Sequence, residues 1–121
     1  VALVTGASRG IGRAIALRLA HDGYALALND IPSNLPVLNA SITYGGQKVK
    51  AMNISADVRE EEQIQAMVEQ TVKDLGAVDV VGIRYYSYMG SSSKDFDQTL
   101  AVNVRGVFLC YKYAAKQMIA Q

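Results

Sequence analysis

A glycine-rich segment directly behind a short apolar run constrains this chain more than any other feature. Val1–Val4 is typical of a buried strand, and Thr5–Gly12 continues it as Thr-Gly-Ala-Ser-Arg-Gly-Ile-Gly. A strand that runs through such a turn into a helix presents backbone N–H groups and the positive helix end to a phosphate group. The order therefore predicts a βαβ unit that binds a nucleotide.

The glycines of this segment have different physical roles. Gly6 lets the chain leave the strand in a conformation that a side chain opposes, Gly10 lets the main chain approach a pyrophosphate, and Gly12 lets the helix pack against the strand. The candidate cofactor-binding residues of the turn are Gly6, Ser8, Arg9, Gly10, Ile11 and Gly12.

A second strand ends at a carboxylate in the position that a nucleotide-binding unit requires. Apolar residues at helical spacing follow the turn until Gly23, and Tyr24–Leu28 then predicts a strand that leads to Asp30. An acidic group at about this separation hydrogen-bonds the adenosine ribose hydroxyls. Asp30 favours NAD because it repels a 2′-phosphate, whereas Arg9 attracts that phosphate. We give Asp30 more weight and expect NAD, with NADP as the alternative.

With these motifs the chain resembles the short-chain dehydrogenases/reductases. Their Thr-Gly-x-x-x-Gly-x-Gly signature matches Thr5–Gly12, and Ala56–Val58 resembles their adenine-contacting Asp-Val. The resemblance implies that Asp57 accepts a hydrogen bond from the adenine amino group, that Val58 lies beside the cofactor, and that Asn103 helps to organise the active site and its proton relay. The opening Val1–Asp30 also resembles diacetyl/acetoin or butanediol dehydrogenases.

This resemblance implies an α/β fold, a truncated Rossmann-type doubly wound parallel sheet of about four strands with flanking helices. It also implies hydride transfer between a nicotinamide cofactor and a small alcohol or ketone. The sequence predicts one partial domain over residues 1–121. After the second strand we expect a helix over 37–44, a strand over 48–53, a helix over 60–75 that Gly76 ends, and a long helix from 95 or 96 to the end.

The fourth strand departs from the family pattern. Val78–Val81 runs straight into Gly82 and Ile83, without the Asn-Asn-Ala that the family carries at this point. A local deletion of about four residues explains the pattern, and it removes about 13 Å of extended chain. We expect either a shortened strand or a slip that draws Arg84–Tyr86 into it.

The acid–base pair of the family is also missing. Reduction of a carbonyl needs a proton donor, and the family uses a tyrosine followed four residues later by a lysine. Only Tyr44 and Lys48 have this spacing, across a Gly-Gly helix stop, so we interpret them as coincidental. Three hypotheses remain: an oxidoreductase domain whose catalytic half lies beyond Gln121 or was lost, a dinucleotide-binding domain without turnover, and a fragment that dimerises through its last helix.

Composition narrows the alternatives further. A net charge of +1 favours neither nucleic acid nor an anionic membrane as a partner, and no apolar run approaches the length of about 18 residues that spans a bilayer. One cysteine, Cys110, fits a reducing, cytoplasmic compartment, and we interpret it as a small buried hydrophobe. His21 is the single histidine, so no metal site is expected. Because the chain starts inside a strand, we also expect trimming before Val1.

Overall fold

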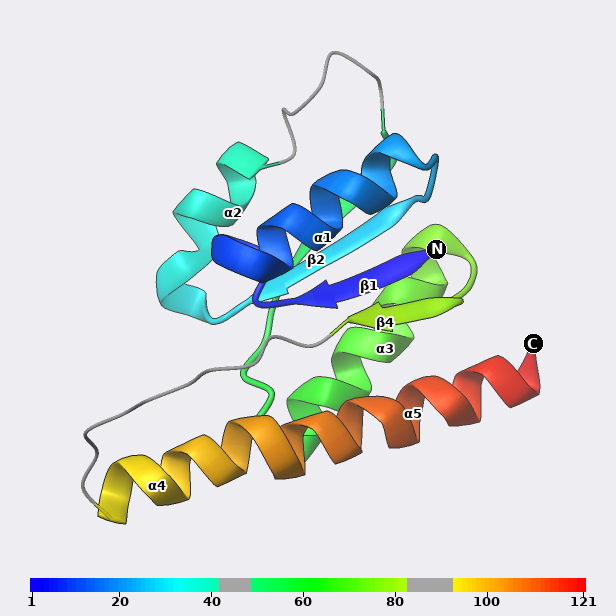
Figure 1. Ribbon diagram of the computed structural model, residues 1–121. Coiled ribbons are helices and arrows are strands. Elements are labelled where there is room, and N and C mark those ends of the chain that lie inside the picture. The colour runs from blue at the N-terminus through cyan, green and yellow to red at the C-terminus, as the bar shows by residue number, and fades with distance from the viewer. Residues whose placement is uncertain (42–48, 83–92) are drawn as a thin grey trace.

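A four-stranded parallel sheet forms the centre of the computed structural model, which describes residues 1–41, 49–82 and 93–121 (Figure 1). The strand order is β3-β2-β1-β4, and β1 pairs with both β2 and β4. Each connection between sequential strands contains a helix, as parallel pairing requires. The strands are β1 (Ala2–Thr5), β2 (Leu26–Asp30), β3 (Ala51–Ser55) and β4 (Val80–Gly82).

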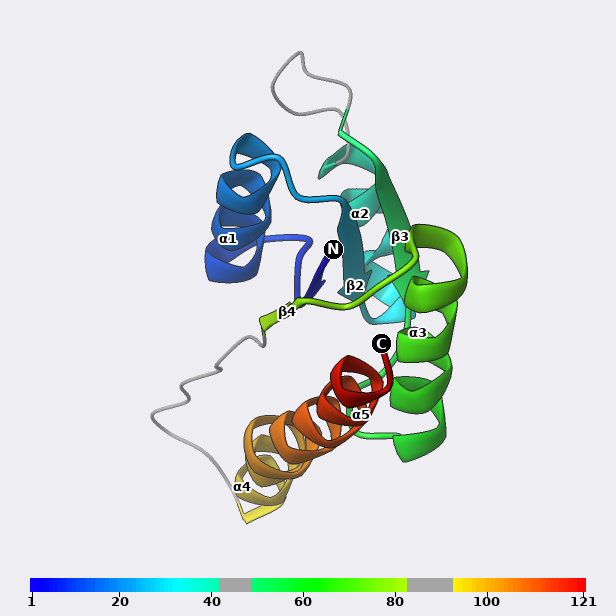
Figure 2. The same ribbon diagram turned by 90° about the vertical axis from the view of Figure 1, so that its right-hand side faces the viewer.

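Helices cover both faces of the sheet, as Figure 2 shows in a side view. On one face, α1 (Gly10–His21) and α2 (Leu35–Ser41) pack against Ala2, Val4, Leu26 and Leu28. On the other, α3 (Glu61–Leu75) and α5 (Val107–Ala120) pack against Leu3 and Ala27. Successive strand residues thus face opposite cores, which explains why β1 and β2 are buried at every position.

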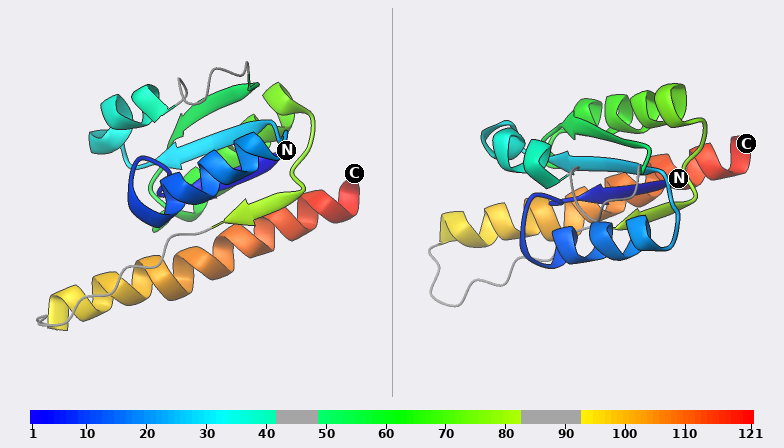
Figure 3. Two further views of the ribbon diagram at one scale, coloured as in Figure 1. Left: turned by 45° about the horizontal axis from the view of Figure 1, so that its top comes forward. Right: turned by 90° about the horizontal axis from the view of Figure 1, so that it is seen from above.

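The last helical stretch is one continuous run whose middle has wider turns. α4 (Ser93–Leu100), η2 (Ala101–Gly106) and α5 follow each other without a break, and the π-helical η2 connects the two α-helices (Figure 3). In Figure 1 the strand arrowheads point towards the side where α1 begins and where α4 projects beyond the sheet. This side is the carboxyl edge of the sheet.

The element predictions are confirmed in kind, and their boundaries move by a few residues. The third strand is Ala51–Ser55 rather than 48–53, and β4 is Val80–Gly82 rather than 78–81. The prolines bracket a one-turn 3-10 helix, η1 (Pro32–Asn34), so α2 begins at Leu35, and Pro36 lies in its first turn, where a missing N–H is tolerated. Gly76 ends α3 with a φ of 97°, as predicted.

The apolar stripes that predicted two of the helices do not form the core. On α1, Ile11 is 67% exposed, whereas Gly12 and Ala16 are buried. On the last run, Val104 and Phe108 are exposed, and the buried residues of α5 are Leu109, Cys110 and Ala114. The periodicity identified helices correctly, but the buried face of each helix includes other residues: the small Gly12 and Ala16 on α1, and Leu109, Cys110 and Ala114 on α5. Over the described ranges, no helix combines the length and apolarity needed to cross a membrane.

Candidate dinucleotide-binding site

The glycine turn at the end of β1 requires glycine for its backbone conformation. Gly6 has a φ of 63°, in the left-handed region that its sequence position predicts, and Gly10 also has a positive φ, 58°, which the sequence reasoning did not predict. A Cβ on Gly12 would lie 2.3 Å from the carbonyl oxygen of Gly6, closer than real atoms approach. Gly12 therefore brings the first turn of α1 into direct contact with the turn that leaves β1.

The N-terminus of α1 opens at this turn. Arg9 is the N-cap residue, and no side chain forms a capping hydrogen bond there. The first turn of the helix contains no acidic residue either. Backbone N–H groups and the positive end of the helix dipole are thus available to an anion, with the exposed Arg9 beside them.

Asp30, at the end of β2, is joined directly to the glycine turn. Its Oδ2 accepts hydrogen bonds from the Ser8 backbone N–H at 3.1 Å and from Ser8 Oγ at 2.6 Å. Its Oδ1 accepts from the backbone N–H of Ile31 at 2.9 Å and from Asn34 Nδ2 at 2.8 Å. The structure therefore brings Asp30 and the turn together, although 22 residues separate Asp30 from Ser8.

These contacts hold Asp30 in its ionised form. Burial is the largest single influence on the pKa of Asp30 and acts to raise it. The hydrogen bonds from Ser8, Asn34 and Ile31 together outweigh burial, so the pKa lies below the ordinary value of 3.8. The site therefore carries a negative charge at neutral pH, and this charge opposes a second anion beside it.

Asn29 connects the ends of three strands, a role that the sequence reasoning missed. Its side-chain Nδ2 donates to the backbone carbonyl oxygens of Ile54 and Ala56, each at 3.1 Å. The backbone carbonyl of Asn29 accepts a hydrogen bond from the Ala7 N–H at 2.9 Å. The side chain is 1% exposed. The sequence did contain a signal for this role, a polar residue at the end of an apolar strand. A buried side-chain amide needs hydrogen-bond partners, which neighbouring strands can supply.

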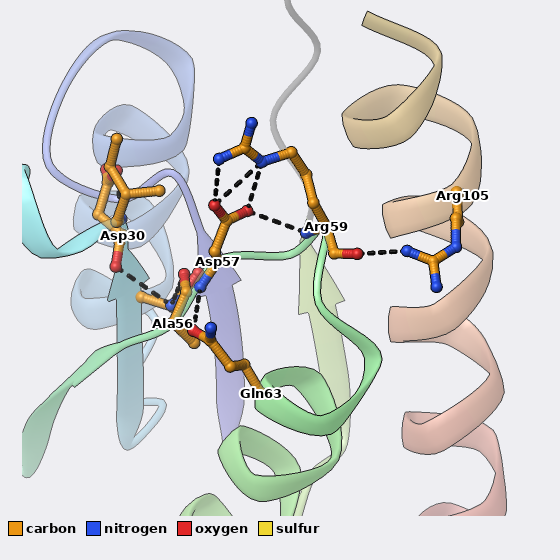
Figure 4. Close-up of polar contacts among 8 residues, drawn as sticks. Asp30, Ala56, Asp57, Arg59, Gln63 and Arg105 are labelled. Carbon is orange, nitrogen blue, oxygen red and sulfur yellow. Dashed lines mark hydrogen bonds and ion pairs between the residues drawn. The ribbon is translucent and has the colours of Figure 1, made fainter. Parts of the chain in front are cut away.

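Asp57 lies beyond β3 at the same edge, where Arg59 engages its carboxylate (Figure 4). Arg59 Nε lies 2.9 Å from Oδ1 and 3.0 Å from Oδ2, and Nη2 lies 2.5 Å from Oδ2. Hydrogen bonds from Arg59 are the main cause that lowers the pKa of Asp57 below 3.8, against the opposing effect of burial. Arg105 of η2 donates to the Arg59 carbonyl. Sequence reasoning did not find this arginine pair.

Val58 contacts η2 (Ala101–Gly106), the helical segment that contains Asn103. A Cβ on Gly106 would be 2.9 Å from the carbonyl oxygen of Val58, so the last residue of η2 packs against the Asp57–Val58 segment. Asn103 lies within η2, a π-helix of six residues. Such wide turns occur frequently at functional sites, and the sequence alone did not predict this one.

Cys110 and His21 were the other residues considered for a catalytic or ligand-binding role. Cys110 is buried, and desolvation raises the pKa of its thiol to about 11. His21 is exposed at the end of α1, 3.5 Å from Asp22. In the segments that the structure describes, no three His, Cys, Asp or Glu side chains form a metal-binding group. Tyr44, Lys48 and the Arg84–Tyr86 stretch lie outside the described residues.

The fold and this edge of the sheet define a Rossmann-type nucleotide-binding protein. The profile of the short chain dehydrogenase family matches residues 1–121. The chain is 47% identical to a short-chain dehydrogenase/reductase of Armillaria gallica, over all of this chain and 49% of the relative. It therefore belongs to the short-chain dehydrogenase/reductase family. The chain spans about half the length of the curated relatives it matches.

Solved structures show the same similarity. A xylitol dehydrogenase with bound NAD⁺ aligns with a TM-score of 0.84 and 36% identity, over 99% of this chain and 48% of that chain. An alcohol dehydrogenase from the archaeon Thermococcus sibiricus, complexed with 5-hydroxy-NADP, aligns with a TM-score of 0.78 and 33% identity, over 97% and 52%. This chain thus aligns with about half of each of these two solved chains.

Proposed function

We propose that this chain is the dinucleotide-binding part of an NAD(P)-dependent oxidoreductase that transfers a hydride between nicotinamide and a small alcohol or carbonyl compound. The observation that carries the proposal is the direct contact between the glycine turn and Asp30, which places the helix N-terminus beside a carboxylate. The first offers N–H groups to a pyrophosphate, and the second accepts from ribose hydroxyls. The nicotinamide would supply or receive the hydride.

We assign the other predicted residues to the same cofactor site. Gly6, Gly10 and Gly12 would give the pyrophosphate access to the α1 N-terminus, with Ser8, Arg9 and Ile11 around it. Asp57 and Val58 would hold the adenine, with Arg59 sharing the Asp57 carboxylate. Asn103 would help to organise the catalytic centre. Because the charge of Asp30 opposes a 2′-phosphate, we propose NAD as the preferred cofactor and NADP as the alternative.

A titration with NADH tests this binding. The fluorescence of NADH should change on addition of the chain, and Asp30→Ala should weaken binding about tenfold or more, because a charge-assisted hydrogen bond is lost. Asp22→Ala removes the same charge from the exposed end of α1 and serves as the control, with circular dichroism to confirm that each variant is folded. Absence of any fluorescence change with the wild-type chain would overturn the proposal.

We further propose that the isolated chain binds the cofactor without turnover. The only Tyr-x-x-x-Lys spacing in the sequence is Tyr44 to Lys48, and it crosses a Gly-Gly pair. A vicinal diol and its ketone are the first substrate pair to assay, since Val1–Asp30 resembles diacetyl/acetoin or butanediol dehydrogenases. An appreciable rate of NADH formation or consumption with the purified chain would contradict this proposal.

A second candidate function is self-association through the last helical run. An exposed apolar stripe follows α4, η2 and α5, and it consists of Leu100, Val104, Phe108, Tyr111 and Met118. Contiguous exposed apolar surface of this kind favours an interface, and a second copy offers the same stripe. Phe108→Glu should shift the chain to a monomer in sedimentation velocity, whereas Lys73→Glu on α3 should leave the distribution unchanged. A monomeric wild-type chain would exclude this candidate.

We propose a cytoplasmic location as well. The single cysteine, Cys110, is a buried free thiol, and this usage suits a reducing compartment. Fractionation of cells that express the full protein would test this location.

A further inference from the structure

The carboxylate of Asp30 is already fully hydrogen-bonded within the chain. A carboxylate offers about four acceptor positions. Ser8 fills two of them on Oδ2, through its N–H and its Oγ, and Ile31 and Asn34 fill two on Oδ1. A ligand hydroxyl can therefore bond to Asp30 only if it replaces one of these donors.

The four donors differ in whether they can move away from the Asp30 carboxylate. The N–H groups of Ser8 and Ile31 belong to the main chain of the glycine turn and of the segment after β2, so they move only with the backbone. The other two are side-chain groups. Ser8 Oγ can rotate about one bond, and Asn34 is half-buried at the end of η1, where its amide can turn towards water.

The two side-chain donors match the number of hydroxyl donors on a ribose with free 2′ and 3′ positions. Each hydroxyl can donate one hydrogen bond to the carboxylate, so the exchange conserves the four bonds to Asp30. A 2′-phosphate, doubly charged at neutral pH, cannot make this exchange, because it lacks the second hydroxyl and brings charge against Asp30.

We propose that Ser8 Oγ and Asn34 Nδ2 occupy, in the free chain, the donor positions on Asp30 that the two ribose hydroxyls of the dinucleotide take in the complex. The inference rests on the proposed dinucleotide function and adds two positioning residues to it. Ser8 and Asn34 keep Asp30 hydrogen-bonded in the absence of ligand, and the ligand must displace them.

This exchange has a signature that a purely structural role does not have. Removal of a displaced donor destabilises the free chain, yet it also removes a bond that binding must break. Asn34→Ala and Ser8→Ala should therefore unfold at lower urea concentration and still bind NADH more tightly, by about 3- to 30-fold for each donor. The affinity for NADPH should change less than the affinity for NADH.

The experiment measures NADH and NADPH affinity by fluorescence and stability by urea unfolding for the two variants. Ser33→Ala in the same turn and Ser55→Ala at the end of β3, both exposed in the wild type, are the matched controls and should change neither quantity. In the wild-type chain, NADH should also shift the side-chain amide resonance of Asn34 in the NMR spectrum. Because Ser8 is fully buried, Asn34→Ala provides the test if Ser8→Ala does not fold.

The outcomes separate the two proposals. Tighter NADH binding together with lower stability supports the exchange. Equal or weaker NADH binding by both variants, beside a wild-type chain that binds, overturns the exchange and leaves the dinucleotide function standing. If neither the wild type nor any variant binds NADH, the dinucleotide function and the exchange are both wrong.

Discussion

Replacement of Gly12 by alanine tests whether close contact between α1 and the glycine turn supports the site. The added Cβ would lie 2.3 Å from the Gly6 carbonyl oxygen, 2.8 Å from the Gly6 carbonyl carbon and 3.1 Å from the Thr5 oxygen. Ordinary contact begins near 3.4 Å, so the helix must retreat by about 1 Å from the turn. All three neighbouring atoms belong to the backbone, and no side chain can rotate away.

Two opposing effects set how far Gly12→Ala lowers the free energy of unfolding. Overpacking at a rigid contact costs about 1–3 kcal/mol, and a clash with backbone belongs at the upper end. Alanine recovers up to about 1 kcal/mol because it is a better helix former than glycine. We expect Gly12→Ala to lower the free energy of unfolding by about 2 kcal/mol, and to weaken NADH binding because the α1 N-terminus moves.

Gly82→Ala is the matched control. A Cβ on Gly82 would meet Ile15 at 3.9 Å and Val4 at 4.0 Å, which are ordinary contacts, and alanine is less costly than glycine in a strand. Its free energy of unfolding should stay within about 0.5 kcal/mol of the wild type or rise. Urea unfolding followed by circular dichroism measures both variants, and the midpoint of Gly12→Ala should fall by about 1 M. Equal midpoints for the two variants would refute the steric argument.

Three further predictions concern Asp57, Asn29 and Cys110. Because Arg59 lowers the pKa of Asp57, their pair stabilises the fold above pH 3.8, and this contribution disappears as the pH falls through the lower pKa of the folded state. Arg59→Gln should therefore lower the free energy of unfolding by about 1 kcal/mol at pH 7 and leave it unchanged once the wild-type carboxylate is protonated. Urea unfolding across this pH range measures both effects. Asn29→Asp places a carboxylate against two carbonyl oxygens, so the free energy of unfolding should fall by about 3 kcal/mol at pH 7 and by less as the pH falls towards 4, where the acid is protonated. A loss of stability in thermal unfolding that does not depend on pH would contradict this account. Since burial raises the pKa of Cys110 to about 11, its thiol should react with a disulfide reagent at pH 8 at least about tenfold more slowly than in urea, and equal rates would show that it is accessible.

Local sequence was sufficient for the elements and for the glycine turn. Positive φ at Gly6, the start of a helix behind the turn and the stop at Gly76 depend on a few neighbouring residues, so the pattern predicts them directly. The sequence was a poorer guide to which face of each helix is buried. Ile11 has the spacing of a core residue but is exposed, because the sheet lies against Gly12 and Ala16 instead.

The hydrogen bonding of the two candidate carboxylates, Asp30 and Asp57, is visible only in the folded structure. The sequence places Asp30 after a strand and Asp57 after another, and it suggests that both face a ligand. The partner that joins Asp30 to the glycine turn is decided in space, because Ser8 reaches Asp30 across 22 residues, whereas Arg59 is a local partner only two residues from Asp57. An acidic residue in a sequence has no visible partners, whereas a folded carboxylate has a limited number of acceptor positions that nearby donors fill.

The sequence by itself determined the strand, turn and helix that can hold a phosphate, because glycine stereochemistry acts over a few bonds. Only the tertiary structure decided that Asp30 is held by Ser8 of the glycine turn, whereas Asn34 and Arg59 are local partners of Asp30 and Asp57. The physical reason is that hydrogen bonds and close contacts depend on distances in space, and the parallel sheet brings the ends of separate strands to one edge.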